Sequence, residues 1–248
     1  MSNKEISIGS WITLGHLSIA EIMADAGFDW LCIDMEHSVI DNYTAEQLIA
    51  IIEAKGCVPY VRVGENDPLI IKRVLDAGAK GVIVPMINSA EDARKAVDSV
   101  KYPPVGTRGV GLARAQGYGF NFEKYARKVN DETTVIAQIE HVEAVNNLEE
   151  ILKVDGIDGT IIGPYDLSGS LGKPGEYDDP KVHQVLDRYE EISRMADKAM
   201  GYHVIKPDGR LVLKKIKAGY TFIAFSLDTL FLGSMCRQEL DKLKINIE

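Results

Sequence analysis

The sequence predicts an α/β fold built as a closed (β/α)8 barrel, and three observations support this prediction. Eight short apolar runs rich in β-branched residues alternate with eight stretches that have the start signals of helices. No hairpin signal interrupts this alternation, which implies parallel strands joined by right-handed crossovers. Eight such units in about 250 residues are typical of a closed barrel. A doubly wound open sheet is the alternative, but the GxGxxG fingerprint that usually follows its first strand is missing.

The first half of the chain supplies four strand–helix units. The expected strands cover residues 7–13, 30–33, 58–63 and 82–86. The expected helices follow polar residues that are typical of helix starts, namely Ser18, Thr44, Asp67 and Ser89. Glycines at 27 and 56 mark the ends of the first two helices.

The second half repeats the pattern after an interruption. Residues 101–130 form a long glycine-rich loop, and loops of this length inside a domain are usually functional. Its glycines could cradle a phosphate, but no Gly-Lys-Ser/Thr follows, which favours a flexible or closely packed loop. The remaining strands are expected at 134–139, 159–163, 201–205 and 221–225. The remaining helices are expected at 143–153, 181–199, 208–218 and from about 228, with a loop from 163 to 180.

Composition and charge exclude several classes of protein. The 248 residues, 46% of them hydrophobic, can bury one core, and no linker divides them, so we expect one barrel domain spanning 1–248. The net charge of −9 argues against nucleic-acid and anionic-membrane partners. No apolar run approaches the ~20 residues that span a bilayer, and the first residues lack the pattern of a signal peptide. The three scattered cysteines fit a reducing compartment without a zinc site, so we expect a cytoplasmic protein.

Two carboxylates follow neighbouring strands of the predicted barrel. Glu140 comes directly after one buried run, and Asp166 follows the next within Gly163-Pro-Tyr-Asp-Leu-Ser168. Because parallel strands end at the same rim, these side chains are expected to lie close together. Two carboxylates can hold Mg²⁺ or Mn²⁺ and leave positions free for a substrate. A helix N-cap or a solvated turn is the alternative for each of them.

Other polar residues fall at the same ends of strands. They are Trp11, Asp34, Glu36, His37, Arg62, Gln138, His203, Ser226 and Asp228. Such a mixture suits a metal-assisted reaction with one general base and one cationic stabiliser. Arg62 interrupts an apolar strand and needs an anionic partner, which is either a structural carboxylate or a substrate. His141 and His203 are interpreted as structural, and Lys206 is the one lysine near a strand end.

Several segments together resemble the HpcH/HpaI aldolase family. They are Gly27-Phe-Asp-Trp-Leu-Cys-Ile-Asp-Met-Glu-His37, Val61-Arg-Val63, Leu75-Asp-Ala-Gly-Ala79, Val84-Pro-Met86, Arg108-Gly-Val-Gly111, Gln138-Ile-Glu140 and Gly163-Pro-Tyr-Asp-Leu-Ser168. The resemblance covers nearly the whole chain in order. It implies a TIM barrel of the phosphoenolpyruvate/pyruvate superfamily type. It also implies a homo-oligomer, a hexamer built as a trimer of dimers, with the C-terminal helix (about 228–248) exchanged between subunits.

The activity implied by the resemblance is that of a class II pyruvate aldolase. Such an enzyme uses Mg²⁺, Mn²⁺ or Co²⁺ and reversibly cleaves a 4-hydroxy-2-oxo acid (2-keto-3-deoxy acid) to pyruvate and an aldehyde, through a metal-bound pyruvate enolate. Glu140 and Asp166 match the two metal ligands. Gln138 and the backbone around Tyr165 and Asp166 match positions that line the pyruvate site.

The resemblance also assigns the proton-transfer and charge-stabilising roles. His37 matches the general base, and Arg62 matches the residue that stabilises the enolate. Asp34 is similar to an acid placed near the site, and Asp76 matches an acid that raises the basicity of the histidine. Asp76, however, ends a predicted helix on the far side of the barrel, so its role would be indirect or exercised across a subunit contact. Tyr165 replaces an alanine that is usual in the family, which narrows the pocket or adds a hydroxyl.

Other functions remain open at this point. A citryl- or malyl-CoA-type lyase and an oxaloacetate decarboxylase would use the same site, although the acidic chain disfavours binding of the CoA phosphates. A catalytically silent barrel that serves as a binding module is the non-enzymatic alternative. The aldehyde partner is undetermined among succinic semialdehyde, lactaldehyde, a tartronate semialdehyde and longer sugar-derived aldehydes.

Overall fold

The computed structural model describes residues 5–245, and residues 1–4 and 246–248 lie outside the described part. Eight parallel strands close into one barrel in chain order. They are β1 (Ser7–Ile12), β2 (Trp30–Asp34), β3 (Val58–Arg62), β4 (Gly81–Val84), β5 (Thr134–Ile139), β6 (Gly159–Ile162), β7 (Ala199–Val204) and β8 (Phe222–Leu227). The barrel predicted from the strand–helix alternation is confirmed.

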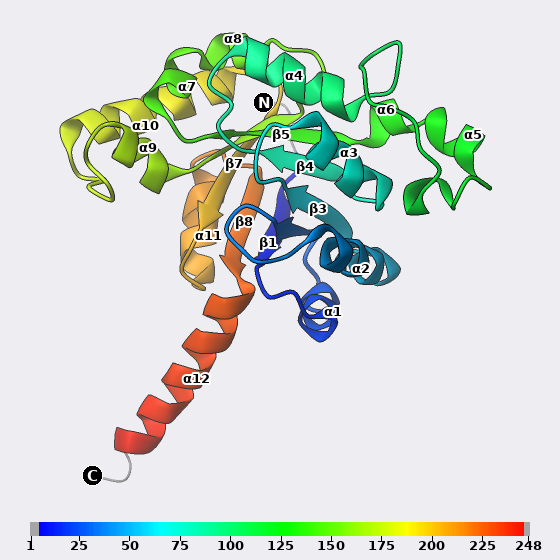
Figure 1. Ribbon diagram of the computed structural model, residues 1–248. Coiled ribbons are helices and arrows are strands. Elements are labelled where there is room, and N and C mark those ends of the chain that lie inside the picture. Colours follow the sequence, from blue (N-terminus) through cyan, green and yellow to red (C-terminus); the bar gives the residue numbers. More distant parts are fainter. Residues whose placement is uncertain (1–4, 246–248) are drawn as a thin grey trace.

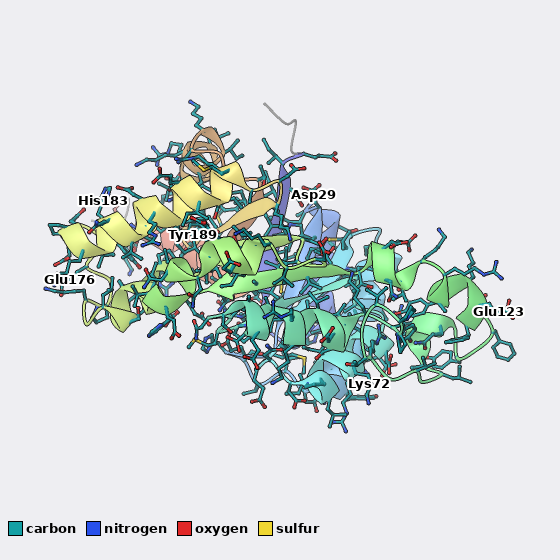
Figure 2. All side chains as sticks on the ribbon, turned by 90° about the horizontal axis from the view of Figure 1, so that it is seen from above. Asp29, Lys72, Glu123, Glu176, His183 and Tyr189 are labelled. Atoms are coloured by element: carbon teal, nitrogen blue, oxygen red, sulfur yellow. The ribbon has the colours of Figure 1, made fainter. Side chains whose placement is uncertain are left out.

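Helices surround the strands on the outside of the barrel (Figure 1). The longer ones are α1 (Leu17–Asp25), α2 (Asn42–Ala54), α3 (Pro68–Asp76), α4 (Ala90–Val100), α10 (Pro180–Met195), α11 (Gly209–Lys217) and α12 (Asp228–Ile245). The shorter ones are α5 (Phe122–Ala126), α6 (Val129–Glu132), α7 (Val142–Asn146), α8 (Leu148–Leu152), α9 (Pro164–Ser170) and the 3-10 turn η1 (Arg114–Gln116). In the view from above, Glu123 on α5 lies at one end of the molecule (Figure 2). Glu176, which follows α9, and His183 on α10 lie at the opposite end.

Two of the first helices begin earlier than the sequence predicts because an upstream side chain caps them. Asp41, rather than Thr44, caps α2, and its carboxylate accepts a hydrogen bond from the Thr44 N–H at 2.8 Å. His16, rather than Ser18, caps α1, and its Nδ1 accepts from the Ser18 N–H at 3.2 Å. The caps predicted for the next two helices are confirmed.

Two later segments differ from the prediction in ways that affect the site. The helix expected over 143–153 is divided into α7 and α8 at Asn147, whose amide donates to the Asn88 carbonyl at 2.8 Å. The loop expected from 163 to 180 contains α9, because Pro164 occupies the first helical position, where its missing N–H is tolerated. Asp166 therefore lies in the first turn of a helix rather than in a loop.

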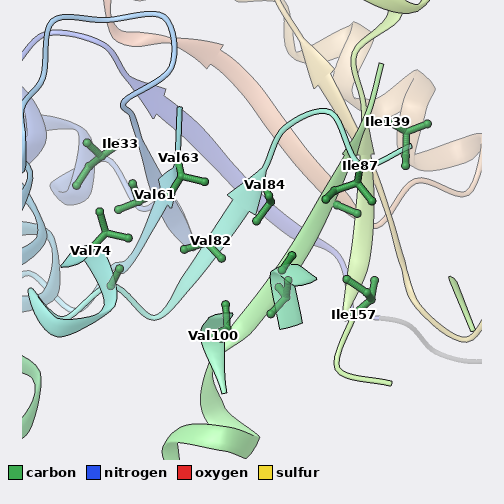
Figure 3. Packing of buried hydrophobic residues seen from close by; sticks show 14 of the residues in the cluster. Ile33, Val61, Val63, Val74, Val82, Val84, Ile87, Val100, Ile139 and Ile157 are labelled. Carbon is green, nitrogen blue, oxygen red and sulfur yellow. The ribbon is translucent and has the colours of Figure 1, made fainter. Parts of the chain in front are cut away.

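The apolar core has two layers, one between strands and helices and one inside the barrel. Branched side chains of the outer layer are seen in Figure 3, including Ile33, Val61, Val63, Val74, Val82, Val84, Ile87, Val100, Ile139 and Ile157. The inner layer consists of Trp11, Trp30, Cys32, Ile83, Ile136, Ile161, Phe222 and Ala224. Trp30 stacks on Phe222 with ring centroids 4.3 Å apart, and Gly9 gives it room because a Cβ there would lie 2.0 Å from the indole. A filled interior leaves the carboxyl ends of the strands as the place for a site.

The long glycine-rich loop lies at the opposite rim, where strands begin. The guanidinium of Arg114 contacts the Glu53 carboxylate at 2.7 Å and the Ala77 carbonyl at 3.1 Å, at the ends of α2 and α3. Buried Arg108 is held in the same region by Asp76. These contacts favour the closely packed loop over the phosphate cradle.

The C-terminal helix α12 extends away from the barrel (Figure 1). Its start is held by Asp228, whose carboxylate accepts hydrogen bonds from the N–H groups of Thr13 and Leu14. Further along, apolar side chains are exposed on it, namely Leu232, Met235, Leu240 and Leu243. Exchange of this helix between subunits stays a prediction, and its expected end at 246–248 lies outside the described residues. Among residues 5–245, no helix combines the length and apolarity that a membrane span requires.

Candidate active site

Strand alternation collects polar side chains above the apolar interior. Successive residues of a strand point to opposite faces, so residues two apart point the same way. Asp34 therefore points into the barrel like Cys32 of the inner layer and lies two residues nearer the mouth. The same alternation brings Arg62 of β3, Gln138 of β5 and His203 of β7 to the mouth. Three of these four side chains were predicted as site residues. The fourth, His203, had been interpreted as structural.

Arg62 lies at the centre of this group and is paired with Asp34. Its Nη2 and Nε donate to the two carboxylate oxygens of Asp34 at 2.7 and 3.0 Å, and its guanidinium carbon lies 4.4 Å from the Trp11 ring centroid. Burial by itself would lower the pKa of Arg62, but hydrogen bonds and the charge of Asp34 outweigh it and raise that pKa. The arginine stays charged, and its anionic partner in the chain is a structural carboxylate.

Asp34 is held ionised by the same pair. Burial would raise the pKa of Asp34, but the hydrogen bond and charge of Arg62 lower it, together with the backbone N–H groups of Glu36 and His37. Asp34 thus fixes the guanidinium and the start of the loop that carries His37. Asp34 therefore acts by positioning other residues. The sequence had indicated only that this acid lies near the site.

Gln138 and Glu140 continue the network across β5. The Gln138 amide donates to Oε2 of Glu140 at 2.5 Å, and its Oε1 faces Nη1 of Arg62 at 3.5 Å. The other carboxylate oxygen of Glu140 accepts from the Met86 N–H at 2.8 Å. Met86 directs this N–H by adopting a φ of 53°, a left-handed conformation that is unfavourable for a residue with a side chain. Backbone strain at the end of β4 therefore orients a predicted metal ligand.

Glu140 and Asp166 converge on one small space next to Gly163. A Cβ placed on Gly163 would lie 3.4 Å from Oε2 of Glu140 and 3.8 Å from Oδ2 of Asp166. Glycine leaves this space open, so that both carboxylates face it. The two residues predicted as ligands from their position after neighbouring strands are brought together.

The electrostatics of this space favour a cation. The buried Oε2 atom of Glu36 has no hydrogen-bond partner and forms an ion pair with Nε of Arg62 at 3.3 Å. Burial raises the pKa of Glu36, Arg62 opposes the rise, and the charge of Glu140 adds to it. A positive charge between the acids would relieve this repulsion. Across residues 5–245 there is no cluster of three or more His, Cys, Asp or Glu arranged to hold a metal.

His37 stands at the rim of the mouth. Its side chain is 67% exposed, and its Nε2 lies 3.7 Å from Oε2 of Glu36. Together with Asp34, Arg62 and His203 it lines a cavity of about 370 Å³. The ring is thus accessible to a substrate in the mouth and retains an acidic neighbour.

His203 lies deeper in the mouth than expected. Its Nε2 is 3.2 Å from the Ser226 carbonyl, and its ring centroid is 5.7 Å from that of Trp11. Burial lowers the pKa of His203 to about 4, so the ring is neutral at physiological pH. Because a carbonyl oxygen can only accept, this contact places the proton of the neutral ring on Nε2. By contrast, His141 is structural as predicted, because its Nδ1 caps α7 by accepting from the Glu143 N–H.

A larger cavity of about 530 Å³ runs from the mouth past α9 to α11. The predicted residues Arg62, Gln138, Tyr165 and Asp166 line one part of it. Its other part is lined by residues that sequence reasoning missed or left without a role, namely Tyr177, Tyr202, Lys206, Lys214 and Lys215. The available signal was the pair of adjacent lysines on a helix that follows a strand of the barrel.

Asp76 is the one predicted catalytic residue that the chain keeps away from the mouth. It is the last residue of α3, which runs back to the rim where strands begin, and it pairs with Nη2 of Arg108 at 2.6 Å. Parallel strands followed by antiparallel helices place a helix end on the far side of the barrel. Within one described chain Asp76 therefore does not reach His37, and its expected catalytic role stays a prediction.

Known proteins resemble this chain over almost its whole length. Residues 7–232 match the family described as HpcH/HpaI aldolase/citrate lyase. The chain is 41% identical over 245 residues to the 2-keto-3-deoxy-L-rhamnonate aldolase of Klebsiella pneumoniae, which covers 97% of this chain and 90% of that protein.

Two solved structures share the fold closely. An HpcH/HpaI aldolase/citrate lyase family protein from Burkholderia cenocepacia superposes with a TM-score of 0.92 at 34% identity, covering 98% of this chain and 96% of that one. The citrate synthase SbnG superposes with a TM-score of 0.86 at 27% identity, covering 98% and 95%. The protein is an enzyme, and its class is that of the carbon–carbon lyases. The chain belongs to the HpcH/HpaI aldolase/citrate lyase family, which confirms the resemblance found in its motifs.

Proposed function

We propose that the protein is a divalent-metal-dependent aldolase that reversibly cleaves a 4-hydroxy-2-oxo acid, such as a 2-keto-3-deoxy acid, to pyruvate and an aldehyde. The observation that carries this proposal is the convergence of Glu140 and Asp166 on the space left open by Gly163. Arg62 and Gln138 line the same cavity as Asp166. Membership of the family and the aldolase named among the relatives support the proposal.

Glu140 and Asp166 would hold the ion, because their carboxylate oxygens face the same space beside Gly163. Mg²⁺, Mn²⁺ and Co²⁺ all accept carboxylate ligands, and two protein ligands leave positions free for a substrate. When bound, the ion supplies a positive charge that polarises the C2 carbonyl of the 2-oxo acid.

Arg62 and Gln138 act on the pyruvate half of the substrate. The pair with Asp34 fixes Nε and Nη2, so that Nη1, which makes only a 3.5 Å contact with Gln138, is the group able to donate to a substrate oxygen. Negative charge develops on the C2 oxygen during cleavage, and a donor oriented in advance at such a position contributes about 3–4 kcal/mol. The guanidinium is already held by Asp34 in the position from which it donates.

His37 serves as the general base. It takes the proton of the C4 hydroxyl, the C4 carbonyl forms, the C3–C4 bond breaks, and the electron pair passes to the C2 oxygen. The protonated His37 then returns a proton, directly or through solvent, to C3, which gives the methyl group of pyruvate and restores the base, so atoms and charge balance. Base catalysis of this kind contributes ~10²–10⁴-fold. Asp34 positions the loop of His37, and the exposure of the ring leaves it free to meet the substrate.

The test is a condensation assay with pyruvate and a panel of aldehydes. We expect activity with Mn²⁺ or Mg²⁺, loss of activity with EDTA and recovery when the ion is restored. Borohydride in the presence of pyruvate should label no lysine, because the mechanism forms no Schiff base. A labelled lysine, or full activity after complete removal of divalent ions, would contradict the proposal.

Two further assays separate the other reactions that the sequence leaves open. Cleavage of malyl-CoA without any aldol product would assign the enzyme to the CoA-thioester lyases instead. Release of CO₂ from oxaloacetate with no aldehyde turnover would assign it to the decarboxylases.

A further inference from the structure

His203 is a polar residue of the mouth to which the proposed mechanism gives no role. It lies near the end of β7, and its ring lines both cavities of the mouth. Trp11 and Arg62 are the other two residues that line both, so the two cavities meet at these three side chains. A group at this junction is accessible to a substrate that occupies either cavity.

The backbone beside His203 is distorted in a way that holds its ring. The carbonyl that accepts from Nε2 belongs to Ser226, whose φ of 54° is a left-handed conformation that is unfavourable for a residue with a Cβ. On the next strand, the pairing of β1 with β8 shifts its register beside Trp11, and irregularities of this kind next to a site direct side chains. Strain at Ser226 thus directs a carbonyl at His203, just as strain at Met86 directs an N–H at Glu140.

A purely structural role accounts for Nε2 of His203 but not for the rest of the ring. The bond from Nε2 links β7 to β8, but these strands are already paired from Gly201 to Val204 of β7. An imidazole is a costly side chain for this purpose, because burial lowers the pKa of His203 to about 4 and the second ring nitrogen must also be satisfied. The structural explanation leaves this second nitrogen without a function.

The second nitrogen, Nδ1, is an acceptor that remains available. Because Nε2 donates to a carbonyl and the ring is neutral, Nδ1 carries a lone pair and no proton. Among residues 5–245 it has no hydrogen-bond partner, and it is not sealed from solvent, in contrast to the unpartnered indole nitrogen of Trp11. Since the ring of His203 lines the two cavities, this accessible nitrogen opens toward the mouth.

An acceptor in the mouth favours a substrate that offers a hydrogen-bond donor. Pyruvate offers none, because its carboxylate and carbonyl oxygens only accept and its methyl group is apolar. The first donor of the aldol product is the C4 hydroxyl, and His37 takes the proton of that group in the proposed reaction. The partner of Nδ1 is therefore a further hydroxyl, carried by the aldehyde half of the substrate.

We propose that His203 is a specificity-determining residue whose Nδ1 accepts a hydrogen bond from a hydroxyl group on the aldehyde half of the substrate. This inference rests on the proposed aldolase function and deepens it, because it makes a hydroxylated aldehyde a better partner than an unsubstituted one. His203 makes and breaks no covalent bond in this account. The hydroxyl lies at C2 or C3 of the aldehyde, and the kinetic test distinguishes the two positions.

The kinetic test compares 2-hydroxypropanal and 3-hydroxypropanal with propanal, each with pyruvate and Mn²⁺. The intrinsic reactivities of these aldehydes differ, so the quantity measured is the change that a substitution causes in the ratio of their kcat/KM values. In His203→Leu, the ratio of one hydroxylated aldehyde to propanal should fall about three- to tenfold, as expected for one neutral hydrogen bond. The aldehyde whose ratio falls locates the hydroxyl. Wild-type ratios for both hydroxylated aldehydes in His203→Leu would overturn the inference.

Two further variants separate a hydrogen bond from a change in packing. His203→Asn carries an acceptor oxygen in place of Nδ1, and its ratio should be at least about twofold higher than that of His203→Leu. His183→Gln changes an exposed histidine on α10 and is the matched control, which should have the wild-type ratio. A loss of packing alone would lower kcat/KM for all three aldehydes equally, and such a uniform loss in His203→Leu would contradict the assignment.

A spectroscopic measurement decides the inference even if the protein has no aldolase activity. In ¹⁵N spectra of histidine-labelled protein, the signals missing from His203→Leu should show a protonated Nε2 and an unprotonated Nδ1. With Mg²⁺ and no pyruvate, the hydroxylated aldehyde should shift the Nδ1 signal and propanal should not. A protonated Nδ1, or the same response to both aldehydes, including none, would refute the inference. Exchange of the pyruvate methyl protons on the same samples reports separately on the aldolase function.

Discussion

The two rims of the barrel use their arginines in different ways. At the mouth, the charge of Arg62 is matched by Asp34, and Nη1 of Arg62 makes only a 3.5 Å contact with Gln138. At the opposite rim, Arg108 pairs with Asp76, and Arg114 pairs with Glu53 and contacts the Ala77 carbonyl. A paired arginine that keeps one donor available can act on a substrate, whereas pairs that join a loop to helix ends hold the fold. The contrast predicts that changes at the mouth lower turnover and changes at the opposite rim lower stability.

The largest effect is expected from the carboxylates that face Gly163. Glu140→Gln and Asp166→Asn remove the anionic oxygens while keeping the shape of the side chain. We expect kcat/KM to fall by about 10³-fold or more, because the ion would no longer bind and would no longer stabilise the negative charge that develops on the C2 oxygen. Steady-state kinetics with titrated Mn²⁺ measure this, and Glu143→Gln, an exposed acid on α7, is the control. Turnover within tenfold of the wild type in either variant would contradict the assignment.

The next effect separates the structural and catalytic parts of Arg62. Arg62→Gln leaves Asp34 buried without its partner, so the free energy of unfolding should fall by about 3–5 kcal/mol. The value of kcat should fall by about 10²–10³-fold, because a donor to the C2 oxygen is removed. Urea unfolding and single-turnover kinetics measure the two quantities.

The double variant Asp34→Asn/Arg62→Gln sharpens this prediction. Removing the orphaned carboxylate should restore much of the stability but none of the turnover. Recovery of kcat together with stability would mean that Arg62 acts only by holding the fold.

A smaller effect concerns His203 and pH. Its folded pKa of about 4 lies below the ordinary 6.5, so the folded chain binds fewer protons than the unfolded chain as pH falls through this interval. The stability that neutral His203 contributes is present above pH 6.5 and is lost as pH falls toward 4. Between pH 7.5 and 5 we expect a loss on the order of 1–2 kcal/mol in the free energy of unfolding.

Denaturant titrations at the two pH values test this, with His203→Leu as the variant. The variant should lose most of the pH dependence, whereas His183→Gln, an exposed histidine paired with Asp187 on α10, should keep it. The same slope in the wild type and in His203→Leu would assign the titration to other groups.

The smallest effect is expected at Tyr165, whose side chain is 58% exposed at the edge of the cavity. Tyr165→Ala should change stability by less than about 0.5 kcal/mol. The KM for the aldehyde should change by a few-fold, because the ring lines the cavity next to Asp166. The KM for pyruvate should remain the same, and an equal shift in both KM values would place Tyr165 in contact with pyruvate.

The sequence was sufficient for those features that depend on local rules. Apolar runs and their spacing predicted all eight strands, and the position of Glu140 and Asp166 after neighbouring strands predicted that they would meet. Parallel strands end at one rim, and a helix that follows a strand ends at the other rim. The sequence therefore placed Asp76, at the end of a helix, away from the mouth.

Features that depend on packing between distant segments were not predictable in the same way. The Met86 N–H donates a hydrogen bond to Glu140, and Met86 adopts a left-handed backbone conformation to do so. This interaction depends on the contact between β4 and β5, which no local sequence pattern encodes. The sequence offered a capping-box motif at Thr44 as the start of α2. The structure shows that Asp41 is the N-cap instead.

The most direct test of the central claim is exchange of the pyruvate methyl protons in D₂O, followed by NMR without any aldehyde. The account predicts rapid loss of the methyl signal with wild-type protein and Mn²⁺, and no loss with EDTA or with Glu140→Gln. Exchange that proceeds equally without a divalent ion, or no exchange with the ion present, would contradict it.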